Sequence, residues 1–362
     1  MKVAATALGL LGARFLGRPF YARVHVTHRC NYRCGMCGVP GREGRPRELP
    51  LDAIQTIARR LHQAGARHVV LTGGEPFLRH DLPEIVASFD RLSFSVRIQT
   101  NGGPQVTRQA LAAVAAAGAR DLSVSVDTLD ASLQDRLCGA RGVLDHALRT
   151  LSLGAELLPR GMTLANIVAS RHNFSQLPEL VRFFSERGIY TYITPVMVHT
   201  ATEDAAPDLR FRGKDESFAV GHTTAGERDA VIDQLIRLRR AGAGLTNSTR
   251  HLQDFRRFLA DGQCRWPCEA GRLSLDVLPD GQCTVCKEKP PLASILQDDF
   301  LATFRSASFR ERCAALTRSC PGCFYGEYRE PYYAVRDLGV LAEWVHDWLR
   351  VFHRGMTWRP SR

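Results

Sequence analysis

Cys30-Asn31-Tyr32-Arg33-Cys34-Gly35-Met36-Cys37 places three cysteines in one short loop, in a CxxxCxxC pattern. Just upstream, residues 21–26 alternate apolar and polar side chains in the manner of a β-strand. Thiolates gathered at the end of a strand can hold one metal centre together. A [4Fe–4S] cube takes four cysteine ligands, so three cysteines would leave one iron open to another ligand. A zinc site is the alternative interpretation of this spacing.

Strand-like and helix-like segments alternate after this loop. The expected strands are residues 21–26, 67–72, 95–99, 122–126, 163–168 and 190–195. The expected helices between them are residues 51–65, 107–117, 144–157 and 177–187, of which the first is clearly amphipathic. Strands that alternate with helices predict an α/β fold with a parallel sheet, whose ligands bind at the carboxyl ends of the strands.

A glycine-rich turn, Gly73-Gly74-Glu75-Pro76, follows the second expected strand directly. Glycines let a ligand approach the backbone closely, and a carboxylate can accept hydrogen bonds from an ammonium group. By itself such a segment is more often a simple turn than a binding site. Its position after the next strand beyond the cysteine loop favours a binding site.

The two motifs together resemble the signature of radical S-adenosylmethionine (SAM) enzymes. The resemblance implies a partial (β/α)6 TIM-like barrel in which Cys30, Cys34 and Cys37 hold a site-differentiated [4Fe–4S] cluster. SAM would chelate the fourth iron, and an electron from the cluster would cleave SAM to a 5′-deoxyadenosyl radical. Gly73, Gly74 and Glu75 would bind the amino group of SAM.

Three further residues resemble SAM-contacting positions of that family. Ser125 ends the fourth expected strand, Arg141 follows in the next loop, and Asn166 lies on the fifth strand. Arg141 would pair with the SAM carboxylate. For each residue, a helix cap or a solvated loop is the alternative. Gln99 and Asn101 are expected to line the same cavity, whereas Cys138 has no expected role.

A second group of cysteines lies near the C-terminus. Residues 273–278, a Pro-Asp-Gly turn and a second short strand predict a β-hairpin between Cys268 and Cys286, and a CxxC follows at Cys320 and Cys323. This arrangement resembles the Twitch domain, the short form of the SPASM extension, and so implies a small cysteine-rich β-hairpin and helix extension. The resemblance assigns these four cysteines to one auxiliary [4Fe–4S] cluster. A zinc ribbon is the alternative, and Cys264, Cys283 and Cys313 leave a second auxiliary cluster open.

The expected segments are an apolar or amphipathic N-terminal helix at 1–19, a core barrel at 20–215, linker helices at 216–262, an auxiliary-cluster domain at 263–330 and a C-terminal amphipathic helix at 331–362. The linker would contain helices at 227–240 and 248–259 after a long loop at 199–226, and the last helix would run over 335–352. The apolar run at 3–13 is too short to span a bilayer, so it would cap the domain or lie in a membrane interface.

Composition restricts the partners. The chain of 362 residues has a formal net charge of +11 and eleven cysteines. The charge favours anionic partners in general, and no basic segment interleaved with aromatic residues suggests nucleic acid. Clustered cysteines favour metal ligation in the reducing cytoplasm, with the inner face of the membrane as the alternative location.

The expected reaction is hydrogen abstraction from a substrate C–H bond, with net oxidation through the auxiliary cluster. A reductant such as flavodoxin or ferredoxin would supply the electron. The two apolar ends favour a lipid, isoprenoid or small-metabolite substrate and peripheral membrane association. The alternatives are a peptide-modifying maturase, an adenosyl-transferring enzyme, and a non-catalytic metal-binding or interaction protein.

Overall fold

The computed structural model describes residues 9, 12–15, 17–39, 48–158, 161–197, 216–220, 223–264, 266–320 and 322–354. Its sheet has nine strands in the order β6-β5-β4-β3-β2-β1-β7-β8-β9. The first six strands run parallel to one another, which confirms the predicted parallel α/β sheet. They are β1 (Tyr21–Thr27), β2 (His68–Gly73), β3 (Ser95–Thr100), β4 (Ala119–Ser125), β5 (Thr163–Ala169) and β6 (Tyr190–Pro195).

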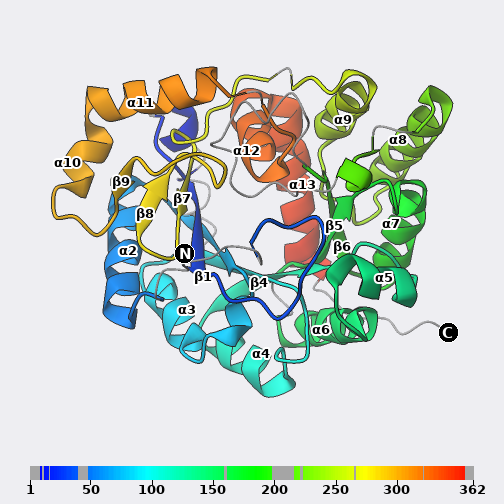
Figure 1. The fold of residues 1–362 in the computed structure, drawn as a ribbon, viewed down its shortest axis with the longest axis horizontal. Coiled ribbons are helices and arrows are strands. Elements are labelled where there is room, and N and C mark those ends of the chain that lie inside the picture. The colour runs from blue at the N-terminus through cyan, green and yellow to red at the C-terminus, as the bar shows by residue number, and fades with distance from the viewer. Residues whose placement is uncertain are drawn as a thin grey trace.

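Helices surround this sheet on its outer side (Figure 1). They are α2 (Leu51–Ala64), α3 (Leu82–Asp90), α4 (Arg108–Ala116), α5 (Ala131–Cys138), α6 (Val143–Leu157) and α7 (Leu177–Glu186). The predicted apolar face of α2 is buried through Ile54, Ile57, Ala58 and Leu61. Neither α3 nor α5 was expected from the sequence. Two further helices, α8 (Ala225–Arg240) and α9 (Thr249–Asp261), follow β6.

The first strand sends apolar side chains outward and polar side chains inward. On β1, Ala22, Val24 and Val26 belong to the main hydrophobic core, whereas Arg23 and His25 line a cavity inside the sheet. The cavity has a volume of about 580 Å³, within the usual range for small-molecule sites. The interior of this barrel is therefore a cavity lined by both polar and apolar side chains, and not a filled apolar core.

The predicted hairpin is present as β7 (Ser274–Val277) and β8 (Gln282–Thr284), which pair antiparallel. The sequence did not reveal that β7 also pairs parallel with β1, with Tyr21 opposite Ser274. The hairpin and the short β9 (Ala293–Ser294) thus continue the barrel sheet itself. The helices α10 (Phe300–Arg305) and α11 (Ala307–Arg318) follow.

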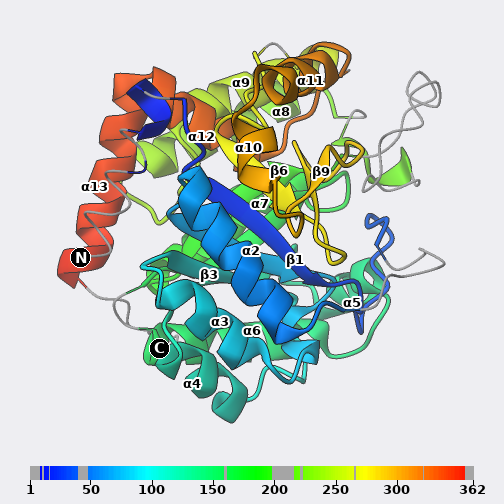
Figure 2. The same cartoon turned by 90° about the vertical axis from the view of Figure 1, so that its left-hand side faces the viewer.

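The predicted helix at 335–352 is present as α13 (Leu338–Arg354), which begins three residues later than expected. A helix that was not predicted, α12 (Gly326–Arg336), precedes it. Asp337 adopts an extended conformation that ends α12, and its carboxylate accepts a hydrogen bond from the Gly339 N–H at 2.8 Å at the start of α13. In Figure 2, α13 runs along one edge of the molecule.

The helix α12 lies between the two sides of the open sheet. Gly326 contacts the Tyr192 side chain of β6, and Glu327 forms an ion pair with Arg23 of β1. The Tyr328 hydroxyl donates to Asp276 of β7 at 2.5 Å. The helix therefore connects β6 to β1 and β7 across the gap that a partial barrel leaves.

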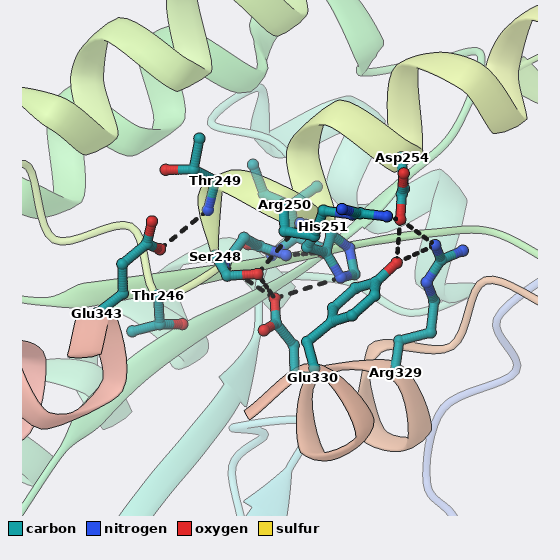
Figure 3. A network of polar contacts seen from close by, with 12 residues as sticks. Thr246, Ser248, Thr249, Arg250, His251, Asp254, Arg329, Glu330 and Glu343 are labelled. Atoms are coloured by element: carbon teal, nitrogen blue, oxygen red, sulfur yellow. Dashed lines mark hydrogen bonds and ion pairs between the residues drawn. The ribbon is translucent and has the colours of Figure 1, made fainter. Parts of the chain in front are cut away.

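A buried polar network holds α12 against α9 (Figure 3). Glu330 of α12 accepts a hydrogen bond from the Ser248 backbone N–H at 2.9 Å and lies 3.3 Å from Nδ1 of His251. On the same helix, Arg329 donates to Asp254 at 3.0 Å. Because buried polar groups are stable only when they are paired, this network specifies one position for α12.

Only part of the expected N-terminal helix can be compared, since most of residues 1–19 lies outside the described residues. Residues 12–15 are helical, and Arg14 donates a hydrogen bond to the Val335 carbonyl of α12. Most of the expected loop at 199–226 also lies outside the described residues, and α8 begins at Ala225. Within the described residues, every helix is too short or too polar to cross a bilayer.

Candidate functional site: a cysteine loop lining a cavity inside the barrel

The three cysteines of the first motif lie on the loop that follows β1, and all three line the cavity. The Cys37 N–H donates to the Cys34 carbonyl at 3.1 Å, which closes a turn between these two residues. The loop is tied to the next strand, because the Glu75 N–H donates to the Arg29 carbonyl at 2.7 Å. The sheet thus places the cysteines at the carboxyl edge predicted for ligands.

The environment of these thiols fits a cationic centre. The pKa of Cys30 is raised to about 11, mainly by burial and in part by the negative charges of Glu75, Cys34 and Cys37, while a backbone hydrogen bond from Tyr32 lowers it. Negative charges on the three thiols would therefore repel one another. A metal centre would offset that repulsion, because coordination deprotonates a thiol.

Gly73 and Gly74 also line the cavity, and both lie against the cysteine loop. A Cβ atom at Gly73 would overlap the Thr27 carbonyl oxygen, and one at Gly74 would overlap that of Arg29. Only glycine allows this close approach of two backbones. The glycines thus position the loop as well as exposing backbone to the cavity.

Glu75 is completely buried and is not among the residues that line the cavity. Its carboxylate accepts hydrogen bonds from the Asn101 N–H at 2.7 Å and the Thr100 hydroxyl at 2.8 Å. Burial raises the pKa of Glu75 to about 7 despite these donors. The Asn101 side chain that Glu75 positions lies 3.8 Å from the Cys30 sulfur.

The other predicted SAM contacts divide into two groups. Ser125 and Asn166 are opposite each other in the β4–β5 register, and both line the cavity. Gln99 and Asn101 line it as well, as expected. Arg141 is exposed and is not among the lining residues.

The cavity continues past the cysteine loop to a charged cluster that the sequence analysis missed. The Lys287 ammonium group pairs with Glu327 at 3.0 Å, and Arg23 pairs with the same carboxylate. His25 lies 3.6 Å from Asp276, and burial lowers the pKa of its imidazole, which is thus neutral near pH 7. The alternation of polar and apolar residues on β1 was the feature of the sequence that could have indicated this charged cluster.

The second cysteine group gathers at the other end of this cluster. Cys268, Cys286 and Cys323 contact the same small hydrophobic cluster, around Val285 and Tyr328. Burial raises the pKa of Cys268 to about 11, with a further contribution from Cys320. Burial also raises the pKa of Cys323, with further contributions from Cys268, Cys286 and Cys264. Cys268, Cys286 and Cys323 thus share one cluster, and the assignment of these residues and Cys320 as ligands stays a prediction.

Cys313 belongs to the same small cluster, whereas Cys283 belongs to the main hydrophobic core. Burial raises the pKa of Cys283, with smaller contributions from Asp276 and Cys313, and the Cys313 sulfur packs against Gly271. Within the described residues, no group of three or more His, Cys, Asp or Glu side chains is arranged to hold a single metal ion.

A sequence model described as the Radical SAM superfamily matches residues 24–212. The GTP 3',8-cyclase 1 of Pseudomonas aeruginosa is 34% identical over 175 residues, which are 47% of this chain and 52% of the relative. The GTP 3',8-cyclase of Marinobacter nauticus is 30% identical over 171 residues, which are 47% of this chain and 51% of the relative. The chain thus spans about half the length of these curated relatives.

Solved structures share the fold at low sequence identity. Streptococcus suis SuiB bound to S-adenosylmethionine superposes with a TM-score of 0.64 at 17% identity, over 83% of this chain and 68% of SuiB. The enzyme anSMEcpe with bound AdoMet and a peptide superposes with a TM-score of 0.59 at 11% identity, over 90% of this chain and 98% of that chain. Both matches extend beyond the barrel.

Proposed function

Because the chain belongs to the radical SAM superfamily, we propose that it abstracts a hydrogen atom from a C–H bond of a substrate held in the cavity. Its cofactors are [4Fe–4S] clusters and SAM, which together supply a 5′-deoxyadenosyl radical by reductive cleavage of SAM. The observation that carries the proposal is that Cys30, Cys34, Cys37, Gly73 and Gly74 line one cavity at the carboxyl edge of the sheet.

In this proposal, Cys30, Cys34 and Cys37 hold the cluster. Gly73 and Gly74 present backbone groups to SAM, and Glu75 supports the site from behind by fixing Asn101. Ser125 and Asn166 contact SAM from the walls of the cavity. Arg141 would have to approach from outside the cavity to reach the SAM carboxylate.

We further propose that Cys268, Cys286, Cys320 and Cys323 hold one auxiliary [4Fe–4S] cluster. Lys287 directly follows Cys286 and lines the cavity, which supports a position for this cluster near the substrate. Four cysteine ligands leave no open iron, so electron acceptance and net oxidation are favoured over substrate binding to the cluster.

The walls of the cavity support a small polar metabolite as the substrate. Arg23, Lys287 and Glu327 line it together with the Tyr192 hydroxyl. An isoprenoid chain would leave the Tyr192 hydroxyl without a hydrogen-bond partner, at a cost of roughly 1–3 kcal/mol, whereas Arg23 and Lys287 are already paired with Glu327. A peptide is the second candidate, because the fold matches SuiB and anSMEcpe, whose structures include complexes with peptides.

Two partners complete the proposal. A reductant such as flavodoxin or ferredoxin would supply the electron in the cytoplasm. Peripheral association with the membrane would use the outer face of α13. Leu338, Val345 and Leu349 are exposed there, whereas the acidic Glu343 and Asp347 both pair with Arg239.

The experiment that tests the proposal uses anaerobically reconstituted protein. Iron and sulfide are measured, dithionite and SAM are added, and 5′-deoxyadenosine is assayed. We expect about eight irons per chain, the content of two cubes, together with 5′-deoxyadenosine. About four irons with activity would overturn the auxiliary cluster and the oxidative outcome, whereas no 5′-deoxyadenosine at any iron content would favour a non-catalytic metal-binding protein.

A further inference from the structure

Two arginines line the cavity from alternate strands of the sheet. The strand register places Arg23 of β1 and Arg97 of β3 on either side of Val70 of β2, and all three residues line the cavity. Arg23 is paired from outside the six parallel strands, because α12 supplies Glu327 and β7 supplies Asp276. The surroundings of Arg97 are different.

The guanidinium group of Arg97 is only partly paired. Its Nε is buried and has no hydrogen-bond partner among the described residues. Its ion pair is with Asp121 of β4, where a terminal nitrogen lies 3.7 Å from the carboxylate, beyond hydrogen-bonding distance. The other oxygen of that carboxylate accepts a hydrogen bond from the Met162 N–H at 2.7 Å. Arg97 therefore retains donors for a ligand in the cavity.

The groups near Arg97 leave its positive charge largely in place. Burial lowers the pKa of His68 on β2 to about 4, with a further contribution from Arg97, so the imidazole is neutral near pH 7. Asp347 of α13 lines the same cavity, but it pairs with Arg239 at 2.8 Å. Asp121, at 3.7 Å, offsets the charge of Arg97 only in part.

Arg97 lies far from the cysteine loop. Asn101, whose amide nitrogen is 3.8 Å from the Cys30 sulfur, follows β3 directly, and Arg97 lies four residues earlier on that strand. Four residues of extended strand span roughly 13 Å. In Figure 2, α13, whose Trp344 lines the cavity, lies on the opposite side of the molecule from α5, to which the cysteine loop is hydrogen-bonded. The cavity thus reaches from the cysteine loop to α13.

We propose that Arg97 binds an oxyanionic group of the substrate, a carboxylate or a phosphate, in the part of the cavity remote from the cysteine loop. The inference rests on the proposed function, because it takes this cavity as the substrate site. A guanidinium group donates two parallel hydrogen bonds to such an anion, and an enclosed site strengthens their attraction. The substrate is therefore an anionic metabolite whose charged group is several bonds from the C–H bond that reacts.

The test measures the binding of two small anions, inorganic phosphate and succinate, to the anaerobically reconstituted holoenzyme by calorimetry. SAM is present at saturation, so that its own site is filled, and chloride keeps the ionic strength constant. Wild type is expected to bind one or both anions at a single saturable site. Binding of phosphate alone indicates a phosphorylated substrate, and binding of succinate alone indicates a carboxylated one.

Three variants identify the residue responsible. R97Q is expected to weaken binding of the anion at least ten-fold. R97K is expected to weaken it several-fold, because lysine keeps the charge but lacks the planar fork of arginine. R182Q is the matched control, since it removes one positive charge from the exposed face of α7, and it should bind the anion as wild type does.

A second measurement uses wild type alone, in case R97Q does not fold. Phenylglyoxal modifies accessible guanidinium groups, and mass spectrometry of peptides locates the modified arginines. The anion is expected to protect Arg97 and not Arg182. No saturable binding of either anion, equal binding by R97Q and R182Q, or modification of Arg97 that neither anion reduces would overturn the proposal. Anion binding at Arg97 in a protein that forms no 5′-deoxyadenosine would overturn the proposed function instead.

Discussion

The guanidinium group of Arg23 on β1 forms an ion pair with the carboxylate of Glu327 on α12, a residue 304 positions later in the chain. The side chains are 7% and 18% exposed. Lys287 pairs with the same carboxylate at 3.0 Å. The first strand, the cysteine hairpin and the closing helix thus meet at one carboxylate beside the cavity.

Substitution of Glu327 by glutamine should destabilise the protein by about 3–5 kcal/mol, because it removes the nearer of the two buried carboxylates that pair with Arg23. The free energy of unfolding is measured by urea denaturation of wild type and E327Q. The matched control is E156Q, since Glu156 pairs with Arg108 on the surface and should contribute little. Equal losses in the two variants would contradict a special role for the buried pair.

The pKa of Glu327 also predicts that the stability of the protein depends on pH in the acid range. Burial opposes ionisation of Glu327, but Lys287 and Arg23 outweigh it and lower its pKa to about 2 from an ordinary 4.5. A lowered folded-state pKa stabilises the protein above the unfolded-state pKa, and the contribution is lost as the pH falls from about 4.5 toward 2. The stability difference between wild type and E327Q should therefore shrink over this range. A difference that stays constant to pH 3 would contradict the assignment.

The two cysteine groups should be separable by iron analysis. C37A and C323A should each lower the iron content from about eight to about four per chain, because each removes a ligand of a different cube. Only C37A should abolish 5′-deoxyadenosine formation. C313A is the control and should retain both clusters, since Cys313 packs against Gly271 and is not assigned as a ligand. Loss of 5′-deoxyadenosine in C323A would mean that the two groups do not act separately.

Sequence periodicity was sufficient for the parallel sheet and for the hairpin, because both follow from local patterns of apolar and turn residues. The pairing of β7 with β1 was not predictable in that way, since Tyr21 and Ser274 are distant in the chain. The break at Asp337 was missed because an apolar pattern continues through it. A local signal was present, as Asp337 followed by Leu and Gly is a helix-capping sequence.

The site was predicted where motifs are contiguous and missed where distant elements meet. Cys30, Cys34 and Cys37 were predicted from their spacing and from the family resemblance, whereas Cys138 gains its position only from α5. That helix has eight residues and was overlooked, although Asp130 caps its start and Gly139 ends it with a φ of 61°. Arg23 was missed because its significance depends on Glu327.

Asn166 and Arg141 should differ in their effect on SAM. N166A should raise the KM for SAM at least several-fold, because Asn166 lines the cavity opposite Ser125. R141A should have a smaller effect, since Arg141 is exposed and outside the cavity lining. The measurement is the rate of 5′-deoxyadenosine formation with dithionite as a function of SAM concentration. A larger effect of R141A would show that its loop closes over SAM.

Membrane association should depend on the exposed apolar face of α13. Among the described residues, the exposed large hydrophobic side chains are Phe15 and three residues of α13, namely Leu338, Val345 and Leu349. The acidic residues of this helix do not oppose an anionic surface, because Arg239 contacts Glu343 at 3.3 Å and Asp347 at 2.8 Å. With a net charge of +11, the chain should favour anionic vesicles.

The measurement is co-sedimentation with phosphatidylcholine vesicles, with and without phosphatidylglycerol, at low and high salt. Wild type should bind the anionic vesicles at low salt, and L338S/V345S should bind them several-fold more weakly. The control is A113S/A116S, which changes two exposed residues of α4. Equal binding by both double variants would exclude α13 as the contact. Binding that salt does not weaken would exclude an electrostatic contribution, because exposed charges are screened at high ionic strength.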